Sequence, residues 1–180
     1  AHPQIDAVLC FNDLTALAYA LSHRDVACVI TEPVMTNSCM VLPDAGFHDG
    51  LRQLCLKHGA LLIIDETHTI SSGLGGYTRV HSLRPDIFVV GKCVAGGMPT
   101  AVWGLSPTTA ERYIQVNADR RSGRSGMGTT LSANPMQFAC LAATLGEVMT
   151  PKAYAHMEKL AGRLSRGLRK AIERHKAPWH

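Results

Sequence analysis

Two short apolar runs in the middle of the chain constrain its fold more than any other feature. Residues 60–64 are uninterrupted Ala, Leu and Ile and lead directly into Asp65, and residues 87–90 are Ile-Phe-Val-Val, followed after one glycine by Lys92. Both runs are rich in β-branched residues and lack polar alternation, which is typical of strands buried on both faces. If these strands are parallel neighbours, Asp65 and Lys92 lie at the same carboxyl edge, where open α/β sheets bind their ligands.

The order of the remaining segments predicts an α/β domain. A third apolar run, residues 26–31, comes earlier in the chain and ends at Glu32. The run 101–105 follows Lys92 too closely for a parallel crossover, so we expect it to pair antiparallel. Helical spacing and capping residues predict helices over 13–22, 44–59, 107–116, 134–149 and 151–175, with Asp44 as the cap of the second. The chain is therefore expected to form a mostly parallel sheet covered by helices.

Composition limits the classes of partner. Hydrophobic residues make up 46% of the chain and charged residues 18%, as in globular proteins. Eight of the 18 basic residues lie within 152–176, and a basic helix can contact nucleic acid or a membrane. Because no aromatic residue is interleaved after Tyr154 in this helix, a solvated outer face is favoured, with no nucleic-acid partner. No apolar run of about 18 residues and no signal peptide are visible, so we expect a cytoplasmic protein without a membrane partner.

The cysteines and histidines do not indicate a disulfide framework or a metal site. The six cysteines include no C-x-x-C pair, and the nine histidines no H-x-x-x-H spacing. Cys28 in a predicted strand and Cys55 in a predicted helix are expected to be buried thiols, as is Cys93 beside the lysine. We also expect Trp103 to lie in the core.

Three successive strands end in an ionisable residue, namely Glu32, Asp65 and Lys92. An Asp–Lys pair at a surface can be a plain ion pair worth about 0–1 kcal/mol. The functional alternative places a ligand between the two groups. A lysine amine condenses with aldehydes, and a carboxylate about 4 Å from a ring nitrogen attracts its proton by about 4 kcal/mol at an effective dielectric of about 20, roughly 3 pKa units. These are the two protein groups that pyridoxal phosphate most needs.

Four ordered motifs resemble those of a known family. They are Glu32-Pro33-Val34, the run 61–66 ending in Asp-Glu, Gly91-Lys92 with Gly96-Gly97-Met98-Pro99, and the segment 129–135, which reads Thr-Thr-Leu-Ser-Ala-Asn-Pro. Over residues 11 to 150 the chain resembles class III pyridoxal-phosphate-dependent aminotransferases, and within them the branch around glutamate-1-semialdehyde aminomutase. The resemblance implies a fold type I transferase that moves an amino group between an amino donor and a carbonyl acceptor, or the related intramolecular aminomutase.

The resemblance also implies a role for individual residues. Lys92 would be the Schiff-base lysine, and Asp65 would pair with the pyridine nitrogen of the cofactor. Thr67 stands where the family usually has Val against the ring face. Thr130 would bind the cofactor phosphate of the neighbouring subunit in a homodimer, and Glu32 would support the substrate side of the pocket. His68 is expected to form a supporting hydrogen bond, the alternative being contact with the ring oxygen or a substrate.

Family members are more than twice as long as this chain. Residues 1–180 would then form part of the large, pyridoxal-phosphate-binding domain, without the N-terminal phosphate-binding segment and the C-terminal small domain, and would not catalyse transamination alone. One alternative is an inert or merely binding fragment. Another is a P-loop nucleotide hydrolase, although no G-x-x-x-x-G-K-[ST] motif is present. The β-keto, ω-amino and semialdehyde branches of the family all remain open as substrate classes.

Overall fold

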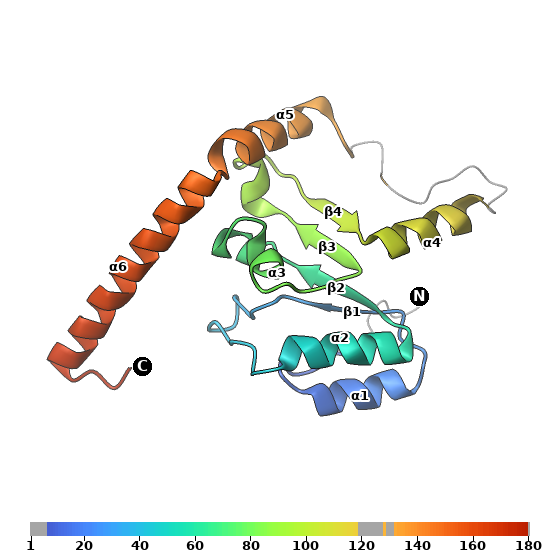
Figure 1. Cartoon of the computed structure of the whole chain (residues 1–180), viewed down its shortest axis with the longest axis horizontal. Coiled ribbons are helices and arrows are strands. Elements are labelled where there is room, and N and C mark those ends of the chain that lie inside the picture. Colours follow the sequence, from blue (N-terminus) through green and yellow to red (C-terminus); the bar gives the residue numbers. More distant parts are fainter. Residues whose placement is uncertain (1–6, 119–127, 129–131, 180) are drawn as a thin grey trace.

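The computed structural model of the chain describes residues 7–118, 128 and 132–179. A four-stranded sheet occupies the centre, with helices on one side of it and beyond its ends (Figure 1). The strands are β1 (Cys28–Thr31), β2 (Leu61–Asp65), β3 (Ile87–Val90) and β4 (Val102–Leu105). The helices are α1 (Leu14–Ser22), α2 (Phe47–His58), α3 (Gly76–Val80), α4 (Pro107–Ala118), α5 (Pro135–Ala143) and α6 (Pro151–His175). Three shorter turns are η1 (Thr69–Ser72), η2 (Lys92–Ala95) and the π-helical η3 (Thr144–Val148).

The sheet has the predicted mostly parallel topology. Its strand order is β1-β2-β3-β4, in which β1, β2 and β3 run parallel and β4 pairs antiparallel with β3. The register places Ile30 beside Ile63, Ile63 beside Ile87, and Ile87 beside Leu105. The connections between the parallel strands carry α2 and α3. β2 and β3, whose ends lead to Asp65 and Lys92, are direct neighbours, as the sequence predicted.

Local signals set most helix ends. Asp13 caps α1 by accepting a hydrogen bond from the Ala16 amide at 2.8 Å. Gly59 ends α2 in the left-handed conformation at φ 75°, as expected for a C-terminal glycine. The prediction for the start of α2 is wrong: its cap is Gly46, at φ 81°, and Asp44 contributes only its backbone carbonyl to the turn. A glycine was needed here because the chain enters the helix through a left-handed residue.

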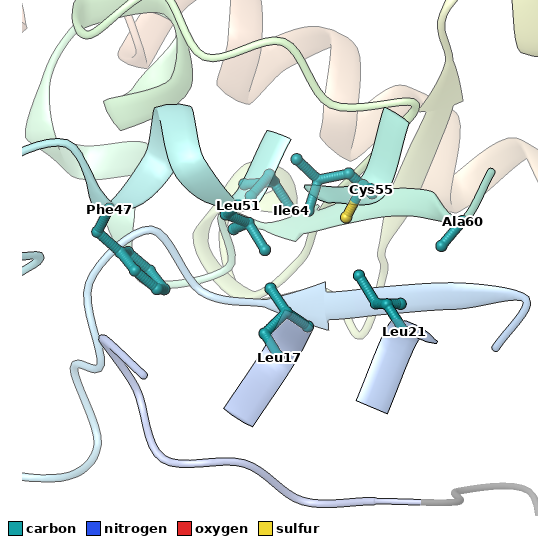
Figure 2. Close-up of a cluster of buried hydrophobic side chains, with 8 residues drawn as sticks. Leu17, Leu21, Phe47, Leu51, Cys55, Ala60 and Ile64 are labelled. Carbon is teal, nitrogen blue, oxygen red and sulfur yellow. The ribbon is translucent and has the colours of Figure 1, made fainter. Parts of the chain in front are cut away.

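The main core lies between the sheet and the pair α1 and α2. Figure 2 shows the side chains of these helices meeting the strand β2. Leu21 is 1% exposed, Leu51 2% and Ile64 1%, and Cys55 is fully buried among them as predicted. The cluster comprises Leu17, Leu21, Phe47, Leu51, Cys55, Ala60, Leu62 and Ile64. Burying alternate residues of β2 fixes which way Asp65, at the end of that strand, points.

The face of the sheet away from α1 and α2 is open at its edge strands among the described residues, whereas every residue of β2 and β3 is buried or half-buried. Ile30 of β1 is 64% exposed and Trp103 of β4 51% exposed, and Cys28 of β1 is exposed, so the expectation of a buried thiol there is wrong. Val89 of β3 pairs with Trp103 of β4 on one side and with Asp65 of β2 on the other. Residues paired across neighbouring strands point to the same face of the sheet, so Asp65 lies on this open face. The sequence could not show this, because apolar strand residues look alike whether or not a second layer covers them.

The helix α6 leaves the sheet and extends away from it (Figure 1). Its first turn is anchored by Tyr154, whose hydroxyl donates to the Ile70 carbonyl at 2.9 Å. Burial raises the pKa of the Tyr154 hydroxyl, with smaller contributions from Cys93 and Glu66. The helix carries a stripe of apolar side chains, of which Leu164 is 63% exposed and Leu168 55%, so no described element covers this stripe.

Candidate active site

Three strand ends bring the predicted charged residues to one edge of the sheet. Asp65 is the last residue of β2 and pairs with Val89 of the parallel strand β3. Lys92 follows two residues after the end of β3, and Glu32 directly follows β1. The carboxyl ends of parallel strands meet at one edge, which is where ligands bind in open α/β sheets. The structure therefore places Glu32, Asp65 and Lys92 on the same edge of the sheet.

Lys92 adopts a backbone conformation that few side-chain-bearing residues adopt. Its φ is +53°, in the left-handed region, at the first residue of the turn η2. Two residues of this turn, Val94 and Ala95, are 1% and 2% exposed and pack in a second apolar cluster with Val90. This buried anchor holds the turn in place while the Lys92 side chain remains exposed. Backbone strain held by packing is common at functional sites.

The Lys92 amine contacts His68. Its Nζ lies 2.7 Å from His68 Nε2, and the other ring nitrogen, Nδ1, contacts the Thr36 hydroxyl. Thr36 Oγ1 donates to Glu32 Oε2 at 2.6 Å, and Glu32 Oε2 also lies 3.4 Å from His68 Nδ1. His68 therefore forms hydrogen bonds within the site, and the choice between a supporting role and contact with the ring oxygen or a substrate stays a prediction. A continuous chain of side chains leads from the lysine amine to the Glu32 carboxyl group.

One Asp65 carboxyl oxygen accepts a hydrogen bond, while the other accepts none from a described residue. Its Oδ1 accepts from the Thr67 backbone amide at 2.9 Å, which orients the half-buried carboxyl group. Thr67 lies close to Gly91: a side-chain carbon built there would sit 3.7 Å from Thr67 Oγ1 and 3.4 Å from the Ala101 side chain. The edge thus combines a primary amine, an oriented carboxyl group and a small hydroxyl residue.

Glu66, the residue directly after Asp65, has a structural role. Its side chain is fully buried and accepts hydrogen bonds from the Thr69 hydroxyl at 2.6 Å, the Tyr77 amide at 3.1 Å and the Thr78 amide. Gly76 is required beside it, since a side-chain carbon there would lie 2.7 Å from a Glu66 oxygen. Glu66 therefore ties the connection after β2 to the strand end and is not available to a ligand.

Other predicted residues lie elsewhere. Thr130 is outside the described residues, so its predicted phosphate contact stays a prediction. Close to Thr130 in the sequence, Gln137 donates to the Pro99 carbonyl at 3.0 Å and joins α5 to the loop after Lys92. Cys93 is exposed, so the expectation of a buried thiol is wrong. After the left-handed residue Lys92, the turn buries Val94 and Ala95 instead. Trp103 lies on the open sheet face, not in the core.

Within 7–118, 128 and 132–179 no group of three His, Cys, Asp or Glu side chains is arranged to hold a metal ion. None of the helices in that part of the chain is both long and apolar enough to cross a membrane.

A family model described as "Aminotransferase class-III" matches residues 4–178. The chain belongs to the class-III aminotransferase family. It is 38% identical over 173 residues to a glutamate-1-semialdehyde 2,1-aminomutase of Anaeromyxobacter sp. (strain Fw109-5), covering 93% of this chain and 38% of that protein. The resemblance seen in the four sequence motifs is therefore confirmed.

Solved structures give the same result for the fold. A glutamate-1-semialdehyde-aminomutase from Pseudomonas aeruginosa PAO1 superimposes with a TM-score of 0.89 at 52% identity, covering 97% of this chain and 39% of that one. A variant of that aminomutase was solved in complex with PMP. A transaminase with PLP bound superimposes at a TM-score of 0.81 and 26% identity, over 97% of this chain and 41% of that one. The predicted fold class is confirmed, and the chain spans about 38–41% of the length of these relatives.

Thr36 is the site residue that sequence reasoning missed. It lies in the loop after β1, four residues beyond Glu32, and contacts both Glu32 and His68. A lone threonine in a loop carries no signal of its own in a single sequence. Its relevance follows only from the return of this loop toward the end of β2, 32 residues later in the chain.

Proposed function

We propose that this class-III aminotransferase chain is part of the large domain of a pyridoxal-phosphate-dependent aminotransferase or intramolecular aminomutase. Such an enzyme moves an amino group between an amino donor and a carbonyl acceptor, with Lys92 as the covalent attachment point. The single observation that carries the proposal is the common edge of Asp65 and Lys92 at the ends of two adjacent parallel strands. The PMP and PLP complexes of the similar aminomutase and transaminase support it.

The residues present fit this cofactor. Lys92 presents an exposed primary amine, and Asp65 presents a carboxyl oxygen beyond the one bonded to Thr67. Gly91, which is buried and has no side chain, keeps the backbone beside Thr67 open. When bound, pyridoxal phosphate supplies an aldehyde that reacts with amines and a ring that withdraws electrons from the carbon bearing the amino group.

The chain's own residues would act in three ways. Lys92 would hold its amine at the sheet edge, where that amine would attach the cofactor and, when unattached, could carry a proton. Asp65, fixed by the Thr67 amide, keeps a ring nitrogen protonated by its negative charge. Thr67 would pack against the ring face, and Glu32 would support the substrate side of the pocket.

The remaining parts of the proposal concern assembly. We propose a cytoplasmic homodimer in which Thr130 binds the cofactor phosphate in the neighbouring active site. The 180 residues would form part of the large domain, since they span 38% of the length of the Anaeromyxobacter relative. Alone they would lack transaminase activity, because residues outside this stretch would complete the phosphate site and choose the substrate. The substrates would be a small amino donor and a small carbonyl acceptor.

The test is covalent trapping of pyridoxal phosphate at Lys92. The protein at its natural length is incubated with the cofactor, reduced with borohydride, digested and analysed by mass spectrometry. We expect the pyridoxyl group on the Lys92 peptide and a visible absorbance band that reduction abolishes. Lys92→Ala should lose both, Asp65→Asn should shift the band and weaken binding, and the control Lys159→Ala on α6 should match the unaltered protein. Trapping on other lysines, or equally in Lys92→Ala, would refute the proposal.

A further inference from the structure

A four-residue hydrogen-bonded chain connects the Lys92 amine to a carboxyl group. Its members come from three segments: Lys92 from the turn η2, His68 from the loop after β2, and Thr36 and Glu32 from the loop after β1. The Lys92–His68 contact is 2.7 Å and the Thr36–Glu32 contact 2.6 Å. The side chains of His68 and Glu32 are 34% and 23% exposed, so solvent screens their interaction only in part.

The direction of the hydrogen bonds can be derived from their chemistry. The Thr36 hydroxyl has one hydrogen, which it donates to Glu32, so toward His68 it can only accept. His68 Nδ1 therefore carries a hydrogen, and in the neutral ring Nε2 is left as an acceptor facing Lys92. Each donor in the chain points toward Glu32. The hydrogen-bonding pattern thus prepares His68 to receive a proton from the lysine.

We propose that His68 acts as a base that takes a proton from the Lys92 ammonium group, with Glu32 stabilising the resulting imidazolium. One N–H bond breaks at Lys92 Nζ and one forms at His68 Nε2, so the pair keeps a total charge of +1 and no oxidant or reductant is needed. The Nδ1 hydrogen stays on His68, facing Thr36 and the Glu32 carboxylate. Lys92 then has a free electron pair with which to attack an aldehyde carbon. This inference rests on the proposed function of Lys92 and specifies how that amine is made reactive.

The charged groups around His68 are consistent with this direction of transfer. Among the described residues, Lys92 and Glu32 are the charged side chains in contact with the ring. Asp65 and Glu66, from the same connection, have other partners: Asp65 bonds the Thr67 amide and Glu66 is enclosed by three donors. A proton on His68 therefore meets one negative group, Glu32, at 3.4 Å.

The test measures the reactivity of Lys92 without the cofactor. The cofactor-free protein at natural length is methylated with formaldehyde and cyanoborohydride across a pH series, and the rate at each lysine is read from peptide masses. Lys159, exposed on α6, serves as the reference within the same molecule. His68→Gln keeps groups that can hydrogen-bond to Lys92 and Thr36 but cannot take a proton. We expect it to slow Lys92 about 100-fold near neutral pH relative to Lys159 and to move its pH–rate profile to higher pH.

Two further variants separate the outcomes. Glu32→Gln should shift the pH–rate profile of Lys92 in the same direction by a smaller amount, and it keeps the inference testable if His68→Gln does not fold. His156→Gln, which replaces an exposed histidine on α6, is the control and should change nothing. If His68→Gln and Glu32→Gln leave the rate and the profile unchanged, the inference is overturned. A slower rate with an unmoved profile also overturns it, because it would mean that His68 only orients the amine.

Failure of the proposed function gives a different pattern. In that case pyridoxal phosphate is not trapped on Lys92 in the unaltered protein, whatever the methylation rates show. If pyridoxal phosphate is trapped on Lys92 and His68→Gln is trapped equally fast at every pH, the proposed function stands and the role of His68 is refuted.

Discussion

Replacing Glu66 with alanine tests whether the residue beside Asp65 is structural. The fully buried carboxyl group accepts from the Thr69 hydroxyl and from the amides of Tyr77 and Thr78. Alanine leaves these donors without an acceptor, and each buried unpaired donor costs about 1–3 kcal/mol. The two amides are only partly buried, so we take the lower end and expect a loss of about 3 kcal/mol. The ratio is about 2–4 °C per kcal/mol for 150–250 residues and smaller for a longer protein, so the unfolding temperature should fall by up to about 12 °C.

The assay is thermal unfolding of the natural-length protein followed by circular dichroism. Glu66→Gln should fall between the alanine variant and the unaltered protein, because one carbonyl oxygen remains as an acceptor. The control is Glu158→Ala, which removes an exposed carboxyl group from α6 and should change the unfolding temperature little. If Glu66→Ala unfolds at the same temperature as Glu158→Ala, the structural role assigned to this carboxyl group is refuted.

Three further predictions concern stability and reactivity. Asp86→Ala should lower the free energy of unfolding by about 2–4 kcal/mol in chemical denaturation, because it leaves Arg52, whose side chain is 15% exposed, without the partner it holds at 2.5 Å. Burial raises the pKa of Cys55 to about 11, so iodoacetamide near neutral pH should spare Cys55 and modify the exposed Cys93, as read by peptide mass spectrometry. Burial lowers the pKa of His48 below 6.5, so the unfolded chain binds more protons than the folded chain at mildly acidic pH. Stability should therefore decrease as the pH is lowered below about 6.5. His48→Gln should reduce this decrease, as measured by thermal unfolding.

Each of these has a contradicting result. If Asp86→Ala leaves the free energy of unfolding unaltered, water alone satisfies the Arg52 side chain and the ion pair does not stabilise the fold. Equal labelling of Cys55 and Cys93 in the native protein would contradict the burial of Cys55. An unchanged dependence of unfolding temperature on pH in His48→Gln would show that another group binds the protons.

Several features of the site could be predicted from the sequence because their causes are local. Apolar runs rich in β-branched residues gave three strands, and the short spacing after Lys92 gave the antiparallel fourth. Asp13 and Gly59 marked helix ends that the structure confirms. Asp65 and Lys92 could be placed at one edge because parallel strands align their carboxyl ends.

Other features depended on contacts between distant segments. The two neighbours Asp65 and Glu66 look equivalent in the sequence, yet one lies half-buried at the open face and the other is enclosed by donors from η1 and α3. The contact of Thr36 with His68 joins residues 32 positions apart. Neither can be derived from periodicity, which reports only which residues share a face of one element.

The sequence by itself determined the strands, their parallel order and the identity of the charged residues that end them, since apolar periodicity and capping act over a few residues. Only the tertiary structure decided which sheet face is covered, which of two adjacent carboxyl groups is free, and that an imidazole stands between the Lys92 amine and Glu32. The physical reason is that burial and hydrogen-bond partners depend on how separate segments pack, and a side chain's chemistry is set by those partners.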